Sequence, residues 1–142
     1  MVANSRFAVA VHTAASATLA YRQARGGGYV SSEQLAASVR TNPVVVRRII
    51  RALARAGVVA TKEGKGGGAR LARSPRRIAL LQIYRAVEDE GSVLAYNPNP
   101  PNRSCPVSCG IKDALAPVFG AVDDAVALTL GKATLKDVLD RI

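Results

Sequence analysis

The sequence has no tryptophan and few aromatic residues, with four tyrosines and two phenylalanines among 142 residues. Proteins that bind single-stranded nucleic acid use aromatic rings as stacking platforms, so this scarcity argues against that class. No uninterrupted apolar run approaches the ~20 residues that span a bilayer, and residues 1–7 lack the basic and apolar regions of a secretory signal. We therefore expect a cytoplasmic protein without a membrane partner.

Cysteines and acidic residues are also scarce. Two cysteines, Cys105 and Cys109, are too few for a disulfide framework and fit a reducing compartment. Ten acidic residues face 20 lysines and arginines, which gives a net charge of +10 and an isoelectric point near 10.5. This balance favours nucleic acid over acidic proteins or anionic membranes as the partner. The length suits one domain with one core.

Residues 43–57 form an amphipathic pattern. At about 100° per residue, an apolar face of Val46, Ile49, Ile50 and Leu53 lies opposite a face of Arg47, Arg48, Arg51 and Arg55. A helix with such a basic face fits the major groove of B-form DNA. The same pattern also describes an ordinary surface helix with a solvated basic face. The neighbouring segments are needed to choose between these two interpretations.

The segments before this helix carry helix start signals. Residues 4–23 have helical apolar spacing, with Tyr21 at one of the core positions. Ala8, Ala15 and Leu19 lie on the opposite flank, so this helix is expected to be buried on two sides. Residues 29–30 are expected to form a short strand. Ser31 with Gln34 matches a capping box that opens a two-turn helix. Asn42 or Thr41 caps the basic helix, Pro43 suits its first turn, and Gly57 closes it. A short and a longer helix joined by a tight turn predict a helix-turn-helix.

Two short strand-like runs, residues 58–61 and 69–72, flank the glycine-rich basic loop between them and predict a β-hairpin, the wing of a winged helix-turn-helix. Helical spacing then returns at residues 80–90. A Pro/Asn-rich loop with both cysteines follows at 91–110, and a long apolar-striped helix at 111–130 is interrupted by Pro117. Thr134 caps a last helix, 135–142. We therefore predict a mainly α fold with a small β-hairpin wing and a long C-terminal dimerisation helix.

The predicted organisation is a DNA-binding domain at residues 1–90, a loop at 91–110, and a dimerisation and C-terminal region at 111–142. A long apolar stripe outside a compact core is typical of a dimer interface, although it could also pack back on its own domain. The predicted interface residues are Leu115, Val118, Phe119, Val122 and Val126.

The order of these elements and the sequences of several segments resemble a known family. The segments that show the resemblance are Ser-Ser-Glu-Gln-Leu-Ala, residues 42–59, Gly-Lys-Gly-Gly-Gly-Ala-Arg-Leu-Ala and Tyr-Arg-Ala-Val-Glu. They resemble the Rrf-two family of bacterial winged helix-turn-helix transcription regulators, the group of IscR, NsrR and CymR. The Asn-Pro-Asn-Pro and Cys-Pro-Val segments are similar to its YwnA-like branch. The resemblance implies a homodimeric, sequence-specific regulator of double-stranded DNA, usually a repressor, whose long helices cross in the dimer.

We expect a division of labour among the basic and polar residues. Lysines and arginines would neutralise phosphates, while the start of the basic helix would read base edges and the serines would fix the register. The predicted DNA-binding residues are Ser31, Ser32, Asn42, Val44, Arg47, Arg48, Arg51, Arg55, Lys62, Lys65 and Arg70.

Some relatives in the resembled family hold an iron–sulfur cluster on three cysteines, but this chain offers only Cys105 and Cys109, with His12 far away. A full cluster needs four ligands, so we expect no cluster, no other cofactor and no metal. The two thiols could be passive, form a redox switch or ligate something. No catalytic set is apparent, so we expect no enzyme. The alternative function is a basic adaptor making protein or RNA contacts, and any small-molecule effector stays unknown.

Overall fold

The computed structural model describes residues 5–23, 28–88 and 92–142, apart from the side chains of residues 20, 21 and 23. The chain divides into two compact units, residues 1–89 with 130–142, and residues 90–129. The boundary near residue 90 was expected. The grouping of 111–142 differs, because residues 130–142 return to the first unit.

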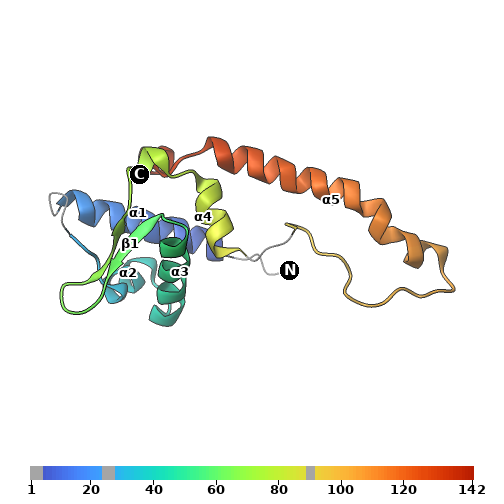
Figure 1. Cartoon of the computed structure of the whole chain (residues 1–142), viewed down its shortest axis with the longest axis horizontal. Coiled ribbons are helices and arrows are strands. Elements are labelled where there is room, and N and C mark those ends of the chain that lie inside the picture. The colour runs from blue at the N-terminus through green and yellow to red at the C-terminus, as the bar shows by residue number, and fades with distance from the viewer. Residues whose placement is uncertain (1–4, 24–27, 89–91) are drawn as a thin grey trace. The chain divides into compact units, whose positions relative to one another are not determined.

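The first unit is built around the helix α1 (Arg6–Gln23) (Figure 1). This helix packs against α2 (Ser32–Val39), α3 (Pro43–Arg55), β2 (Gly68–Leu71), α4 (Leu80–Val87) and α6 (Leu135–Leu139). Ala10, Ala14 and Ala17 are fully buried, and these small side chains allow close helix approach. The buried hydroxyls of Thr13 and Thr18 donate to the carbonyl oxygens one turn earlier. The expected second buried side is incomplete in the single chain: Ala15 is buried, whereas Ala8 and Leu19 are exposed. The predicted core position Tyr21 lies outside the described side chains.

The helix-turn-helix is confirmed with its predicted caps. In α2 (Ser32–Val39), Ser31 and Gln34 form the reciprocal capping box. In α3 (Pro43–Arg55), Asn42 Oδ1 accepts from the Val44 amide at 2.8 Å, and Pro43 occupies the first turn. Gly57 follows α3 with a positive φ of 74°, as a helix-closing glycine does.

The wing is an antiparallel hairpin of β1 (Val59–Lys62) and β2 (Gly68–Leu71), and we use that name for residues 59–71. The expected strand at residues 29–30 is one bridge, with Val30 opposite Ala69. This bridge requires glycine at position 68, because a Cβ there would lie 1.9 Å from the Val30 oxygen.

The end of the chain closes the first unit. After the 3-10 turn η1 (Pro75–Arg77), α4 (Leu80–Val87) begins, and α6 (Leu135–Leu139) packs against η1 and α1. The Leu135 amide donates to the Ile78 oxygen at 2.9 Å, and the Leu80 amide donates to the Ala133 oxygen at 2.9 Å. Leu135 is fully buried in the core. Thr134 caps α6 as predicted. Helix α4 ends at Val87, and Glu88 after it is already extended, so the helix is shorter than the predicted range of residues 80–90.

One core serves this unit, and it consists of small and branched apolar side chains. Its fully buried larger members are Leu35, Val46, Leu53, Val58, Ile78, Ile83 and Leu135.

The second unit joins an extended loop to most of the long helix α5 (Pro106–Lys132). Tyr96 stacks on Phe119 with ring centroids 4.7 Å apart, and Asp123 Oδ1 accepts from the Val93 amide at 2.7 Å. The helix starts five residues before its predicted beginning at 111, so the predicted loop of 91–110 is too long. Cys105 precedes the helix and accepts from the Ser108 amide through Sγ at 3.5 Å, while Pro106 suits the first turn. Pro117 lies inside α5 and does not start it.

Helix α5 also bears on the expectation that the chain has no membrane partner. An 18-residue window within it has a mean hydropathy of 1.4, so its length and composition are those of a helix that could cross a membrane. The charged pair Asp123–Asp124 interrupts its apolar sequence, which is why no continuous run was found. A helix that forms a protein interface has the same composition, and one such helix is weak evidence for a membrane protein.

Candidate nucleic-acid interface

Helix α3 presents the predicted basic face to solvent. Val46, Ile49, Ile50 and Leu53 are buried, whereas Arg47, Arg48, Arg51 and Arg55 are exposed. Val44 and Val45 are 49% and 41% exposed at the start of the helix. These exposed valines can contact a thymine methyl group, which is an apolar feature of the major groove.

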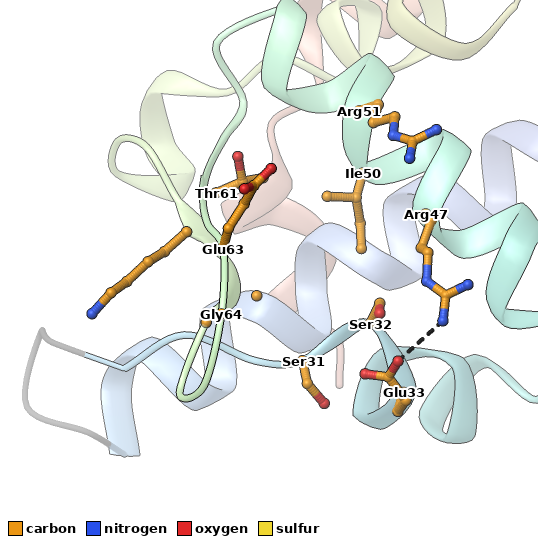
Figure 2. Close-up of a pocket in the computed structure, with 12 residues that line it drawn as sticks. Ser31, Ser32, Glu33, Arg47, Ile50, Arg51, Thr61, Glu63 and Gly64 are labelled. Atoms are coloured by element: carbon orange, nitrogen blue, oxygen red, sulfur yellow. Dashed lines mark hydrogen bonds and ion pairs between the residues drawn. The ribbon is translucent and has the colours of Figure 1, made fainter.

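An open pocket of about 330 Å³ lies where the start of α2, α3 and the wing meet (Figure 2), and we call it the α2–α3–wing pocket. It combines hydroxyls, arginines and glycine backbone. Its lining residues are Ser31, Ser32, Glu33, Arg47, Ile50, Arg51, Thr61, Lys62, Glu63, Gly64, Gly67 and Gly68.

The structure separates the arginines that the sequence placed on one face. Arg47 and Arg51 line the α2–α3–wing pocket, whereas Arg48 lines a different pocket of about 470 Å³ with Arg6, Val45 and Ala86. Positions 47 and 48 are about 100° apart around a helix, so they flank opposite edges of the exposed face. Arg47 and Arg48 therefore form the two edges of the basic face, and Val44, Arg51 and Arg55 lie between them.

The predicted polar contacts at the helix starts are partly used within the protein. Ser31 Oγ accepts from the Gln34 amide at 3.1 Å, and Asn42 Oδ1 caps α3. Each cap uses an acceptor atom and leaves a donor, the Ser31 hydroxyl proton and the Asn42 amide NH₂, for an external acceptor such as a phosphate or a base. These two residues orient their helices and keep a donor on the candidate interface.

The basic residues of the wing are organised by Tyr29, which the sequence analysis missed. The Arg70 guanidinium lies 4.8 Å from the centroid of the Tyr29 ring, and the Lys62 ammonium lies 5.9 Å from it. Cation–π attraction holds both charges against the tyrosine ring, one from each strand of the wing. An isolated tyrosine ahead of a basic hairpin was the available signal. Lys65 is exposed in the turn between the strands.

A second missed residue is Glu33, an acidic group among these cations. Arg47 Nη2 donates to Glu33 Oε1 at 3.1 Å (Figure 2). The pKa of Glu33 is lowered by a hydrogen bond from its own backbone amide, then by the Arg47 and Ser32 side chains. Glu33 stands 14 positions from Arg47 in the sequence, so helical periodicity alone could not pair them.

The remaining predicted residues lie on α5, directly before it and in α1. Cys105 is half-buried and Cys109 exposed, and both thiols are free. Among the predicted interface residues, Val118 is 56% exposed, while Leu115, Phe119, Val122 and Val126 are half-buried. His12 is exposed and lies 3.3 Å from Ser38 Oγ through Nε2.

Comparisons with known proteins identify the fold family. Residues 3–141 match the family model Rrf2, described as an iron-dependent transcriptional regulator. The chain is 39% identical over 139 residues to YwnA of Bacillus subtilis strain 168, which is named as an HTH-type transcriptional regulator, with 98% of each chain covered.

Solved structures agree. A crystal structure titled as that of a DNA-binding protein is 37% identical, with a TM-score of 0.70 and coverage of 95% of this chain and 99% of that chain. The structure of CymR, the global cysteine regulator of Bacillus subtilis, has a TM-score of 0.68 at 19% identity and covers 100% of this chain and 98% of its own. These relatives are regulators and not enzymes, as expected here. The chain belongs to the Rrf2 family of winged helix-turn-helix transcription regulators, the Rrf-two family that its sequence resembles.

Proposed function

We propose that the protein is a homodimeric, sequence-specific repressor that binds double-stranded DNA through α3 and the wing. The observation that carries this proposal is the exposed arginine face of α3 beside the glycine-rich wing. A recognition helix with a basic face enters the major groove, and a wing approaches the neighbouring backbone. Repression follows from occupancy, because a dimer covering a promoter blocks other proteins without needing a further surface.

In this proposal, one set of residues binds phosphates and another set contacts bases. Lys62, Lys65 and Arg70 on the wing neutralise phosphates, which makes affinity steeply dependent on salt. Asn42, Val44 and the arginines of α3 reach base edges, where an arginine can donate two hydrogen bonds to guanine. The register on the duplex is fixed by Ser31 and Ser32 at the start of α2.

The dimer is proposed from the surface of α5. No residue of this helix is buried in the described single chain, although it carries Val118, Phe119 and Val122 on one stripe. Ile111 also exposes 45% of its surface. Exposed apolar patches of this kind mark protein interfaces, and a second copy of the chain is the partner that supplies a matching stripe. A two-fold dimer then expects half-sites about 10 base pairs apart.

We further propose that the second unit receives the signal, either by oxidation of a thiol or by binding a small molecule. Cys109 is exposed in the first turn of α5, where an oxidant can reach it, and its Sγ donates to the Asn102 carbonyl oxygen at 3.5 Å. A pocket of about 290 Å³ lies beside it, lined in part by Tyr96, Phe119 and Lys112. Equal operator binding by the wild type and a C105S/C109S variant, with and without peroxide, would exclude the redox form.

We propose that signal reception requires no iron, whether it occurs by thiol oxidation or by small-molecule binding, although the family model is described as iron-dependent. Among the described residues, no group of three or more His, Cys, Asp and Glu side chains could hold a metal ion. Cys105 and Cys109 supply two of the four ligands that a cluster needs. The residues of one described chain therefore do not fit a cluster. A regulator of this kind acts in the cytoplasm, where its DNA is found.

Selection of genomic fragments by the purified protein tests the proposal. Selected duplexes should compete at least about a thousandfold better than random duplex, the lower range for specific regulators. Equal competition by random duplex would contradict sequence-specific recognition and favour an adaptor that contacts protein or RNA.

A further inference from the structure

The most informative feature that the proposed function leaves unused is the acidic side chain of Glu33 in a DNA-facing pocket. Glu33 and Arg47 lie on facing edges of the α2–α3–wing pocket, with their charged ends directed at each other (Figure 2). Their side chains are 67% and 46% exposed. Glu33 lies in the first turn of α2, where an acidic side chain suits the helix dipole. An exposed ion pair contributes little to folding, so stability does not explain why this carboxylate pairs with Arg47.

Three groups hold the carboxylate in its charged form. They are its own backbone amide, the Arg47 guanidinium and the Ser32 side chain, and together they lower the pKa of Glu33. The group is therefore ionised at neutral pH. A fixed negative charge in this pocket repels DNA phosphates, and it also occupies one N–H of Arg47.

This arrangement affects the possible partners of Arg47 unequally. A phosphate approaching Arg47 must displace the carboxylate or lie beside it, which costs Coulomb energy. A guanine edge is uncharged and accepts hydrogen bonds through O6 and N7. Arg47 keeps further N–H donors after one is given to Glu33, because its guanidinium has five. The pair Arg47–Glu33 therefore favours a base edge over a phosphate as the third partner.

We propose that Glu33 is a specificity-determining residue: by pairing with Arg47 it suppresses binding to random duplex and reserves this arginine for a base edge. This proposal rests on the proposed function. It assigns the discrimination between selected and random duplex to a residue of α2 that acts through Arg47 of α3.

Glu33→Gln tests the proposal, and Glu63→Gln is its matched control. Glu63 lines the same pocket from the wing and makes no ion pair with any described residue. Each variant removes one negative charge, but only Glu33→Gln also releases Arg47. Affinities for a selected duplex and for random duplex are measured by fluorescence anisotropy over a range of salt, with circular dichroism to verify folding.

We expect Glu33→Gln to raise affinity for random duplex about two- to fivefold more than Glu63→Gln does, the range of an exposed ion pair. Its salt slope on random duplex should steepen by about 0.9, the value for one added phosphate contact. Affinity for the selected duplex should rise less, so that the specificity ratio falls. In an Arg47→Met background the two variants should be equivalent.

Indistinguishable Glu33→Gln and Glu63→Gln variants on random duplex, or an unchanged specificity ratio in Glu33→Gln, would overturn the proposal. A wild type that binds selected and random duplexes equally would instead contradict the proposed function. In that case the comparison of the two variants on random duplex still tests whether Glu33 restrains Arg47.

Discussion

At the scale of single residues, the arginines of α3 show how far periodicity leads. Spacing predicted that Arg47 and Arg48 would be exposed, and both are. Spacing could not predict that Arg47 and Arg48 line different pockets, or that Arg47 is paired with Glu33. Both facts depend on how α2, α4 and the wing pack beside α3. Side-chain pairs between separate elements are set by tertiary structure, which one sequence does not display.

The two kinds of DNA contact can be separated by substitution. Arg48→Ala should cost about 1–3 kcal/mol at one operator position and relax base preference there, because a bidentate contact to a base is lost. Lys65→Ala should weaken binding to all duplexes evenly and reduce the salt slope by about 1. Affinities for a panel of single-base operator variants measure both effects. If the two variants behave alike, base reading and phosphate binding are not divided in this way.

Two exposed carboxyls should titrate below their ordinary values. Hydrogen bonds within the α2 turn and from Arg47 lower the pKa of Glu33, and hydrogen bonds from Thr134 lower that of Asp137. A lowered folded-state pKa means that the associated stability is present above the ordinary values of 4.5 and 3.8. It is lost as pH falls through the lowered values. Carboxyl chemical shifts followed by NMR check this, and midpoints at or above the ordinary values would contradict the two hydrogen-bond networks.

At the scale of elements, start and stop signals carried the prediction of the helix-turn-helix and the wing. The cap of α2 by Ser31, the cap of α3 by Asn42 and the closing Gly57 are local chemistry, which a sequence displays directly. The predicted start of α5 at residue 111 is wrong because a glycine such as Gly110, after a Pro/Asn-rich stretch, favours a loop in the sequence pattern. Gly110 instead lies within the helix, after a start formed by Cys105 and Pro106.

The wing depends more on Gly68 than on Gly66. Gly68 has a φ of 139°, and an added Cβ would lie 1.9 Å from the Val30 oxygen. Gly68→Ala should therefore lower the free energy of unfolding by about 2–4 kcal/mol. Gly66 also has a positive φ, of 75°, but nothing lies within 4 Å of the added atom. Gly66→Ala should cost only about 1–2 kcal/mol. Urea denaturation compares them, and equal losses would mean that the contact between Val30 and the wing is not tight.

The apolar stripe of α5 gives a prediction about assembly. Val118→Asp should weaken the proposed dimer at least about tenfold, because an unpaired charge would be buried in the interface. Leu128→Asp is the matched control, since Leu128 is also exposed but lies off the predicted stripe. Sedimentation equilibrium measures both. A wild type that is monomeric at all concentrations, or a dimer that tolerates Val118→Asp, would contradict the predicted interface.

At the scale of the whole molecule, charge and element order determined the functional class, while chain organisation was only partly predictable. A net charge of +10 and a basic helix before a glycine-rich hairpin led to a DNA-binding regulator, and the family match agrees. The return of residues 130–142 to the first unit was not predicted, because the contact of Leu135 with the core joins segments far apart in the sequence.

In the proposed mechanism the arginines of α3 read bases in the major groove. Protection of guanine N7 from dimethyl sulfate on a selected duplex tests this readout, because N7 lies in that groove. The wild type should protect guanines in two half-sites about 10 base pairs apart. Arg47→Ala or Arg48→Ala should expose one guanine in each half-site, while Lys65→Ala should keep the pattern. A bound duplex whose guanines all stay reactive, or whose protection survives both arginine substitutions, would contradict this readout.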